Sequence, residues 1–180
     1  MLSFVSILIV LFSIICFGNS FSLKMANSFY DITEKGADGK DIAFSNFRGK
    51  VVYGVNVASK CGYTASGYAL LSKIAKLKAE GKPVEVLVFP CNQFGAQEPG
   101  TDQEVANFCA LKGVPNATVL TKADVNGPQT RPTYKFLKEK KIFGDIAWNF
   151  AGKFIIDKDG NPLPVKSDGE VEKLVTDLAK

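Results

Sequence analysis

Cys61 lies where reactive cysteines are often found, between a strand and a helix. It stands in the segment SKCGYT (59–64), after the apolar run 50–57 and before a helical pattern that begins near Thr64. The N-terminus of a helix carries partial positive charge and free N–H groups, which favour the nucleophilic thiolate. A Cys-x-x-Cys dithiol would need a second cysteine at position 64. The sequence therefore predicts a single reactive cysteine here, with a buried, space-filling cysteine as the alternative.

The sequence contains no histidine, which narrows the chemistry further. Ser–His–Asp triads, Cys–His proteases and His-ligated zinc are excluded, so any nucleophile must be activated by other groups. Cys61, Cys91 and Cys109 are separated by 30 and 18 residues, spacings typical neither of a zinc knuckle nor of a small disulfide framework. We therefore expect no structural metal site. Cys91 follows Pro90 at the end of a buried strand and is interpreted as a core residue.

The elements that must hold Cys61 are predicted from hydrophobic periodicity and capping signals. The Asp38-Gly39 pair suits the turn of a hairpin, and capping-box spacing links Thr101 with Glu104 and Ser167 with Glu170. Strands are predicted at 29–32, 41–44, 50–57, 84–89, 153–157 and 163–165, and helices at 64–80, 102–111, 132–140 and after Ser167. This order predicts an α/β domain of the thioredoxin-like type, with a central mixed sheet and helices on both faces.

Composition and charge set the class of partner. The chain has 180 residues, of which 46% are apolar, enough for one domain with a sizeable core. Its net charge of +4 comes from scattered residues with no run of five like charges. Neither the small net charge nor its scattered distribution indicates a nucleic-acid interface.

The N-terminus is predicted to be a targeting segment. Residues 4–17 form an apolar run of 14 residues, about the length of a signal-peptide core and short for a membrane span. We expect residues 1–20 to be a signal or targeting peptide, 21–27 a leader remnant or linker, and 28–180 the folded domain. The destination would be secretory, in the endoplasmic reticulum or in a complex plastid. An N-terminal membrane anchor is the alternative, because no Lys or Arg precedes the run.

Three segments, in this order, resemble the signatures of the glutathione peroxidase family: NVASKCGYT (56–64), LVFPCNQFGAQEPG (87–100) and WNF (148–150). The resemblance spans roughly residues 28–180 and is closest to the cysteine-type, phospholipid hydroperoxide-like members. It implies a thioredoxin-like fold and a peroxidase that takes part in the response to oxidative stress.

The resemblance also implies a site of four residues. The peroxidatic residue falls on Cys61, the active-site glutamine on Gln97, and the tryptophan and asparagine on Trp148 and Asn149. The last three are neutral hydrogen-bond donors, which can stabilise a thiolate and polarise a leaving oxygen without histidine. Taken alone, Trp148 would be read as a core residue and Asn149 as a turn residue.

In thioredoxin-dependent members a resolving cysteine lies on the helix after the NQF segment, and Cys109 matches that place. It stands one residue closer to the preceding phenylalanine than expected, a shift of about 100° around a helix axis. A two-cysteine mechanism needs this helix to unwind during turnover, and the shift then matters less. Two departures concern partners: the chain has only two arginines, Arg48 and Arg131, for holding glutathione, and the loop used for tetramer contacts is missing between 112 and 147. A monomer is therefore expected.

We thus expect a thiol peroxidase that reduces hydrogen peroxide and organic or lipid hydroperoxides. Cys61 would become a sulfenic acid, condense with Cys109 to a disulfide, and be regenerated by a thioredoxin-like dithiol, with no metal or organic cofactor. Two alternatives stay open. Glutathione could reduce the sulfenic acid directly, or the chain could be a non-enzymatic thioredoxin-fold module that binds a partner or senses peroxide.

Overall fold

The computed structural model describes residues 26–180, so the predicted targeting peptide (1–20) and most of the predicted linker (21–27) lie outside the described residues. In chain order the elements are η1 (Phe29–Asp31), β1 (Thr33–Lys35), β2 (Asp41–Ala43), η2 (Phe44–Phe47), β3 (Val51–Val57), α1 (Thr64–Ala79), β4 (Val84–Pro90), α2 (Asp102–Leu111), β5 (Thr118–Val119), α3 (Pro132–Glu139), β6 (Phe154–Ile156), β7 (Pro162–Pro164) and α4 (Asp168–Leu178). The two labelled η are short 3-10 turns.

The main sheet has the strand order β5-β4-β3-β6-β7 and is mixed. β3 pairs in parallel with β4, and β4 with β5, whereas β6 is antiparallel to both β3 and β7. β1 and β2 form a separate antiparallel hairpin. This arrangement, with helices on both faces, confirms the predicted thioredoxin-like α/β fold.

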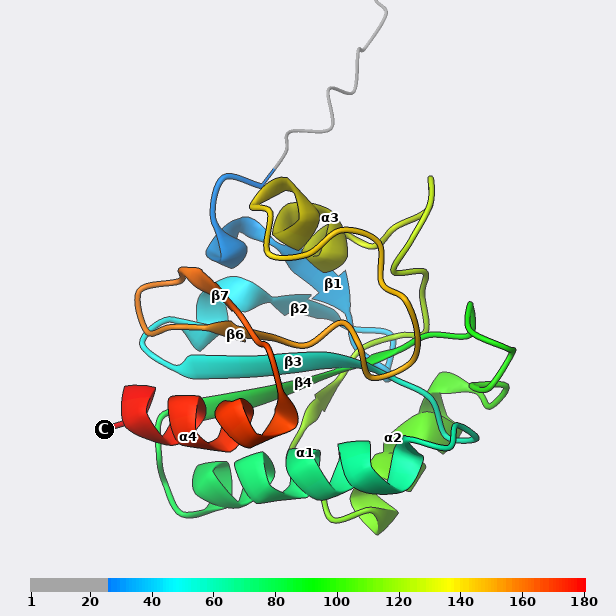
Figure 1. The fold of residues 1–180 in the computed structure, drawn as a ribbon, viewed down its shortest axis with the longest axis horizontal. Helices are drawn as coiled ribbons and strands as arrows, with labels where there is room; N and C mark the ends of the chain where they lie inside the picture. The colour runs from blue at the N-terminus through cyan, green and yellow to red at the C-terminus, as the bar shows by residue number, and fades with distance from the viewer. Residues whose placement is uncertain (1–25) are drawn as a thin grey trace, which may run out of the picture.

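The sheet separates two hydrophobic clusters, because successive side chains of a strand point to opposite faces. On β3, Val51, Tyr53, Val55 and Val57 pack with α1, α2 and α4, whereas Val52 packs on the other side with α3, η1 and η2. Figure 1 shows α1 and α4 side by side on one side of the sheet and α3 with the β1–β2 hairpin on the other. β3 and β4 are buried along their whole length, as their continuous apolar runs predict.

Two local predictions are wrong. Residues 29–31 form the turn η1 and not a strand, because Ser28 and Asp31 close a capping box around it; the strand begins at Thr33. The box predicted at Ser167 and Glu170 does not form, since the Glu170 carboxylate accepts a bond from the Lys166 backbone N–H at 3.0 Å instead. The helix that follows is present, and the short strand β5 was not predicted.

Arg131 is a buried structural residue. Its guanidinium pairs with the Glu34 carboxylate and donates to the Thr121 carbonyl at 3.1 Å. The backbone N–H of Thr133 donates to the same carboxylate at 2.9 Å. The network therefore fastens the β1–β2 hairpin to the start of α3, and Arg131 is not available to bind an anionic ligand.

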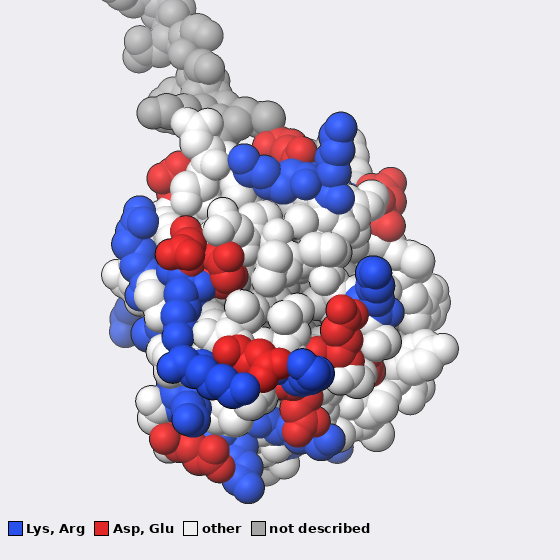
Figure 2. Space-filling model, turned by 60° about the vertical axis from the view of Figure 1, so that its left-hand side comes forward, with Lys and Arg blue, Asp and Glu red and all other residues white. Residues whose placement is uncertain are grey.

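Figure 2 shows acidic and basic side chains interspersed over one face of the molecule. Ion pairs on the surface include Lys73 with Glu172 at 3.0 Å and Lys153 with Asp168 at 2.8 Å. Across the described range, 26–180, every helix is too short or too polar to cross a bilayer.

Candidate active site

Cys61 occupies a tight turn between β3 and α1 that is fixed by Thr64. The Thr64 hydroxyl donates to the Ala58 carbonyl at 2.8 Å and accepts the Cys61 backbone N–H at 3.1 Å. The N-cap residue of α1, Tyr63, makes no side-chain cap, and its backbone N–H donates to Cys61 Sγ at 3.4 Å. The position that a dithiol would give to a second cysteine is therefore used to lock the turn, and a backbone donor at the helix start points at the sulfur.

Gln97 is brought to this corner through its backbone. The Lys60 N–H, one residue before Cys61, donates to the Gln97 carbonyl at 3.0 Å. The Gln97 side chain is half-buried, and its Oε1 accepts from Asn149 Nδ2 at 2.9 Å. Within the described residues no group accepts from Gln97 Nε2, so this amide keeps a donor for a ligand.

Asn149 is a buried residue that orients Gln97. Its Nδ2 donates to Gln97 Oε1 and, at 3.4 Å, to the Phe94 carbonyl, while its Oδ1 has no partner among the described residues. Both of its N–H groups are thus committed to Gln97 and Phe94. The expectation that Asn149 donates to the sulfur is not what this geometry gives; among the described residues, the backbone N–H of Tyr63 is the donor to Cys61 Sγ.

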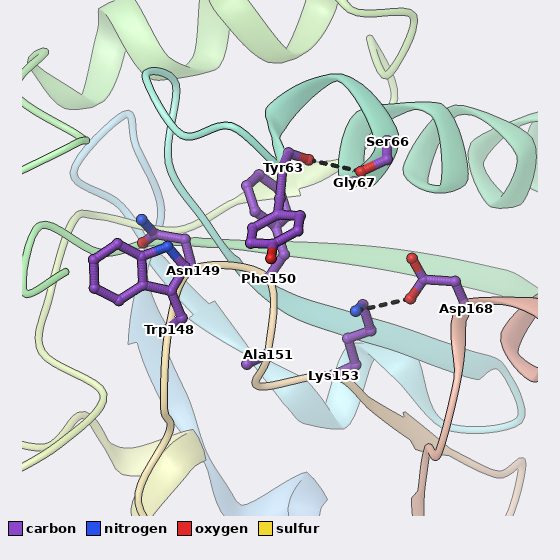
Figure 3. Close-up of a pocket in the computed structure, with 9 residues that line it drawn as sticks. All are labelled: Tyr63, Ser66, Gly67, Trp148, Asn149, Phe150, Ala151, Lys153 and Asp168. Carbon is purple, nitrogen blue, oxygen red and sulfur yellow. Dashed lines mark hydrogen bonds and ion pairs between the residues drawn. The ribbon is translucent and has the colours of Figure 1, made fainter. Parts of the chain in front are cut away.

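Trp148 lies at the rim of the site. Its side chain is 41% exposed and its ring packs near Phe94, with ring centroids 5.9 Å apart. Figure 3 shows Trp148 and Asn149 on the loop before β6, and Tyr63, at the start of α1, in front of Phe150. These residues line a pocket of about 350 Å³, at whose far end Lys153 and Asp168 form an ion pair. The pocket therefore has apolar aromatic walls and one charged end.

The segment 148–150 is held by two residues whose roles the sequence analysis missed. Asn56 of β3 donates from Nδ2 to the Trp148 carbonyl at 3.0 Å, and its backbone carbonyl accepts the Phe150 N–H at 2.8 Å. Gly67 of α1 leaves room for the Phe150 ring, because a Cβ built there would lie 2.3 Å from it. The role of Asn56 could have been suspected from the sequence, because a buried Asn inside an apolar strand needs hydrogen-bond partners. Nothing in the sequence indicated the role of Gly67.

Cys109 is buried in the same hydrophobic cluster as Cys61, and both are free thiols. Its Sγ lies 3.4 Å from the hydroxyl of Tyr68 on α1. Burial raises the pKa of the Cys109 thiol to about 11, although the Tyr68 hydrogen bond lowers it in part. In this conformation Cys109 is therefore a protonated thiol that faces α1.

Cys91 and Gln93 hold the loop that carries Gln97. Cys91 is fully buried, and burial raises the pKa of its thiol. Gln93 Oε1 accepts the backbone N–H groups of Val125 and Asn126 at 2.8 and 3.0 Å. Both residues are thus structural. Over residues 26–180, no three His, Cys, Asp or Glu side chains are grouped so that they could hold a metal ion.

A family model described as "Glutathione peroxidase" matches residues 29–138. "Probable phospholipid hydroperoxide glutathione peroxidase 6, mitochondrial" from Arabidopsis thaliana is 47% identical over 158 residues, which cover 84% of this chain and 67% of the relative. "Glutathione peroxidase 1" from Helianthus annuus is 44% identical over 157 residues, covering 81% and 93%. Among solved structures, T. cruzi GPX1 superposes with a TM-score of 0.64 at 32% identity, covering 84% of this chain and 96% of that one.

The family match includes Cys61, Gln97 and Cys109, whereas Trp148 and Asn149 lie beyond residue 138. The hydrogen bond from Asn149 to Gln97 joins these two parts of the chain. The site is therefore assembled by the fold from three separate segments.

Proposed function

Because the chain belongs to the glutathione peroxidase family, and is therefore an oxidoreductase that acts on peroxide, we propose that Cys61 carries the peroxide-reducing step. One arrangement carries this proposal. The Asn149–Gln97 bond and the Lys60–Gln97 bond gather the three segments around a cysteine whose sulfur already receives a backbone N–H. Such a set can hold a sulfur anion without any titrating base.

In the first step the Cys61 thiolate attacks one oxygen of the hydroperoxide. The S–O bond forms as the O–O bond breaks, Cys61 becomes a sulfenic acid, and the alcohol or water leaves after taking up one proton. Gln97 Nε2, which has no acceptor among the described residues, is the donor we assign to the departing oxygen. Asn149 acts through Gln97 and is a positioning residue in this scheme.

In the second step the Cys109 thiol condenses with the sulfenic acid. The S–S bond forms, the S–O bond breaks, and water leaves. Because Cys109 is buried against Tyr68, α2 must loosen before the two sulfur atoms meet. Of the ten residues of α2, only Val105 and Cys109 are buried, so this helix is held by few core contacts.

An external thioredoxin-like dithiol is the reductant we assign to the resulting disulfide, and the cycle needs neither a metal nor an organic cofactor. The substrate is a hydroperoxide. The aromatic walls of Tyr63 and Trp148 suit organic and lipid hydroperoxides as well as hydrogen peroxide. Relatives named as phospholipid hydroperoxide glutathione peroxidases support that breadth. We propose that the enzyme works as a monomer.

Localisation rests on residues outside the described range. We propose that residues 1–20 direct the chain into the secretory route, to secretion, the endoplasmic reticulum or a complex plastid, with a membrane anchor as the alternative. Two of the relatives are named as mitochondrial and chloroplastic proteins. Sequencing the mature N-terminus checks this: a start at Phe21 supports cleavage, and a start at Met1 supports an uncleaved anchor.

The burial of Cys109 favours one second candidate, in which glutathione reduces the Cys61 sulfenic acid directly. Peroxide consumption with thioredoxin or with glutathione, in wild type and Cys109→Ser, separates the two schemes. The proposal predicts faster turnover with thioredoxin and its loss in Cys109→Ser. Equal glutathione-supported rates in both proteins would establish the second candidate instead. Absence of peroxide consumption with either thiol would contradict the enzymatic function itself.

A further inference from the structure

Tyr68 is a buried residue of α1 that the scheme above does not use. Its side chain is 1% exposed, and within the described range its hydroxyl has one hydrogen-bond partner, the sulfur of Cys109 at 3.4 Å. A buried phenol hydroxyl usually has a partner, because leaving it unpaired costs free energy. The bond to Cys109 is therefore the contact that satisfies this hydroxyl in the reduced protein.

The ring of Tyr68 packs between two segments that the proposed cycle needs. Its centroid lies 5.2 Å from that of Phe108, the residue before Cys109, and 6.1 Å from that of Phe150, the residue after Asn149. Both pairs are edge-to-face, and α2 lies near the N-terminal end of α1 (Figure 1). The ring thus holds the packing and the hydroxyl holds the thiol, so that a Phe at this position separates the two roles.

The two ends of α2 are fastened differently. At its start, Asp102 Oδ1 accepts the Lys122 backbone N–H at 2.7 Å, and Val105 is buried. Beyond Val105, Cys109 is the one buried residue of the helix. The hydrogen bond from Tyr68 is therefore one of few contacts that hold the end of α2 against α1.

We propose that the Tyr68 hydroxyl is a positioning group of the resolving step, which holds the Cys109 thiol against α1 and so sets how readily Cys109 is released to the Cys61 sulfenic acid. The inference rests on the function proposed above. The hydroxyl takes no part in the bond changes: the S–S bond forms, the S–O bond of Cys61 breaks, and the thiol proton leaves with that oxygen as water. Because α2 loosens before the sulfur atoms meet, the hydrogen bond stabilises the dithiol and not the disulfide.

The test compares Tyr68→Phe with Tyr53→Phe in the full-length protein. Tyr68→Phe keeps the ring and removes the hydroxyl that contacts Cys109. Tyr53→Phe, the matched control, changes a tyrosine of the same buried cluster that is not the partner of Cys109. Near-UV circular dichroism establishes that each variant is folded. Reduced protein then receives one equivalent of hydrogen peroxide, and quenched samples are mapped by mass spectrometry for the Cys61 sulfenic acid and the Cys61–Cys109 disulfide.

In Tyr68→Phe the disulfide should form about two- to tenfold faster than in wild type, the range expected for the loss of one hydrogen bond. Sulfenic acid formation at Cys61 should be unchanged, and Tyr53→Phe should match wild type in both steps. Alkylation of Cys109 in the unoxidised protein should accelerate by the same factor, because it needs the same release. Disulfide formation that is unchanged or slower in Tyr68→Phe, or equally accelerated in Tyr53→Phe, would overturn the inference.

The reduction potential of the Cys61–Cys109 pair gives a second reading, which does not depend on rates. Loss of a bond made only by the dithiol should lower the potential by about 10 to 30 mV, which is the same two- to tenfold change at about 30 mV per tenfold. Equilibration of each protein with dithiothreitol redox buffers measures it. Equal potentials in Tyr68→Phe and Tyr53→Phe would contradict a preferential hold on the reduced form.

A second pair of variants keeps the test decisive if Tyr68→Phe does not fold. Cys109→Ser keeps a group that can bond the Tyr68 hydroxyl, whereas Cys109→Ala does not. Backbone amides of α2 should exchange about two- to tenfold faster in Cys109→Ala than in Cys109→Ser, and equal exchange would contradict the inference. Wild type that forms no Cys61–Cys109 disulfide overturns the two-cysteine scheme and this inference with it, and that result is visible without any variant.

Discussion

Cys61 and Cys109 are both buried free thiols of one hydrophobic cluster, yet they lie in opposite surroundings. Cys61 lies in a turn that Thr64 locks and receives a backbone N–H on its sulfur. Cys109 faces a tyrosine hydroxyl, and burial raises the pKa of its thiol to about 11. The difference suits their proposed roles. An attacking sulfur needs hydrogen-bond donors already in place, whereas a resolving sulfur must stay protonated until the sulfenic acid has formed.

The helices that carry them differ in the same way. Seven of the 16 residues of α1 are buried, against two of the ten of α2. α1 lies along the sheet and packs on α4, whereas α2 lies near the N-terminal end of α1 (Figure 1). A rigid element therefore holds the first reaction centre, and a loosely held element carries the second.

The largest expected effect separates Cys61 from Cys91, a buried thiol that has no role in the proposed cycle. Cys61→Ser should lower peroxide consumption by about 1000-fold or more, because within residues 26–180 the Tyr63 N–H is directed at the sulfur of Cys61 and at no other. Cys91→Ser should stay within about twofold of wild type, since Cys91 is a core residue of the sheet. The check is peroxide loss under identical thiol supply. A comparable loss of peroxide consumption in the two variants would contradict the assignment of Cys61 as the peroxide-reducing residue.

The next effect tests whether the corner depends on Gln97 being held in place. Asn149→Ala leaves Gln97 Oε1 without its donor, and we expect sulfenic acid formation at Cys61 to slow by roughly 10- to 100-fold. Asn107→Ala, an exposed asparagine on α2, is the control. Stopped-flow fluorescence of Trp148, the single tryptophan, follows the step. If sulfenic acid formation in Asn149→Ala is as fast as in the control, Asn149 does not position Gln97 for this step.

A smaller effect concerns the packing that positions the 148–150 segment. Gly67→Ala puts a methyl group into the space of the Phe150 ring, whose backbone is tied to β3. We expect a loss of about 1–3 kcal/mol in the free energy of unfolding, measured by urea denaturation. Gly169→Ala, where a Cβ meets open space, is the matched control on α4. Equal stability of the two variants would show that the segment is not held against α1.

The smallest effect is dynamic and compares the two helices directly. Backbone amides of α2 should exchange with solvent roughly tenfold or more faster than those in the middle of α1 in the reduced protein. Hydrogen-exchange mass spectrometry with peptides covering both helices measures this. Slower exchange in α2 than in α1 would contradict the proposal that α2 loosens for the resolving step.

Much of the Cys61 corner could be predicted from the sequence because its determinants are local. An apolar run, a cysteine and a helical period fix a strand, a turn and a helix in order, and the structure has all three. The capping box at Thr101 and Glu104 likewise forms as predicted and starts α2. Local signals misled at residues 29–31, where a capping box turned apolar residues into a 3-10 turn.

The rest of the site depends on contacts between distant segments, which periodicity does not encode. The sequence pointed to Asn149 as a donor, but only the fold reveals that its N–H groups donate to Gln97 and Phe94. It placed Cys109 on a helix without saying that the thiol faces Tyr68.

The most direct test of the account is the order in which the three cysteines of the described domain, Cys61, Cys91 and Cys109, change. Reduced wild-type protein receives one equivalent of hydroperoxide, is quenched with an alkylating agent at successive times, and is mapped by mass spectrometry. The account predicts oxidation of Cys61 first, then a Cys61–Cys109 disulfide, with Cys91 remaining a free thiol throughout. A Cys61 that stays a free thiol while peroxide is present would contradict it.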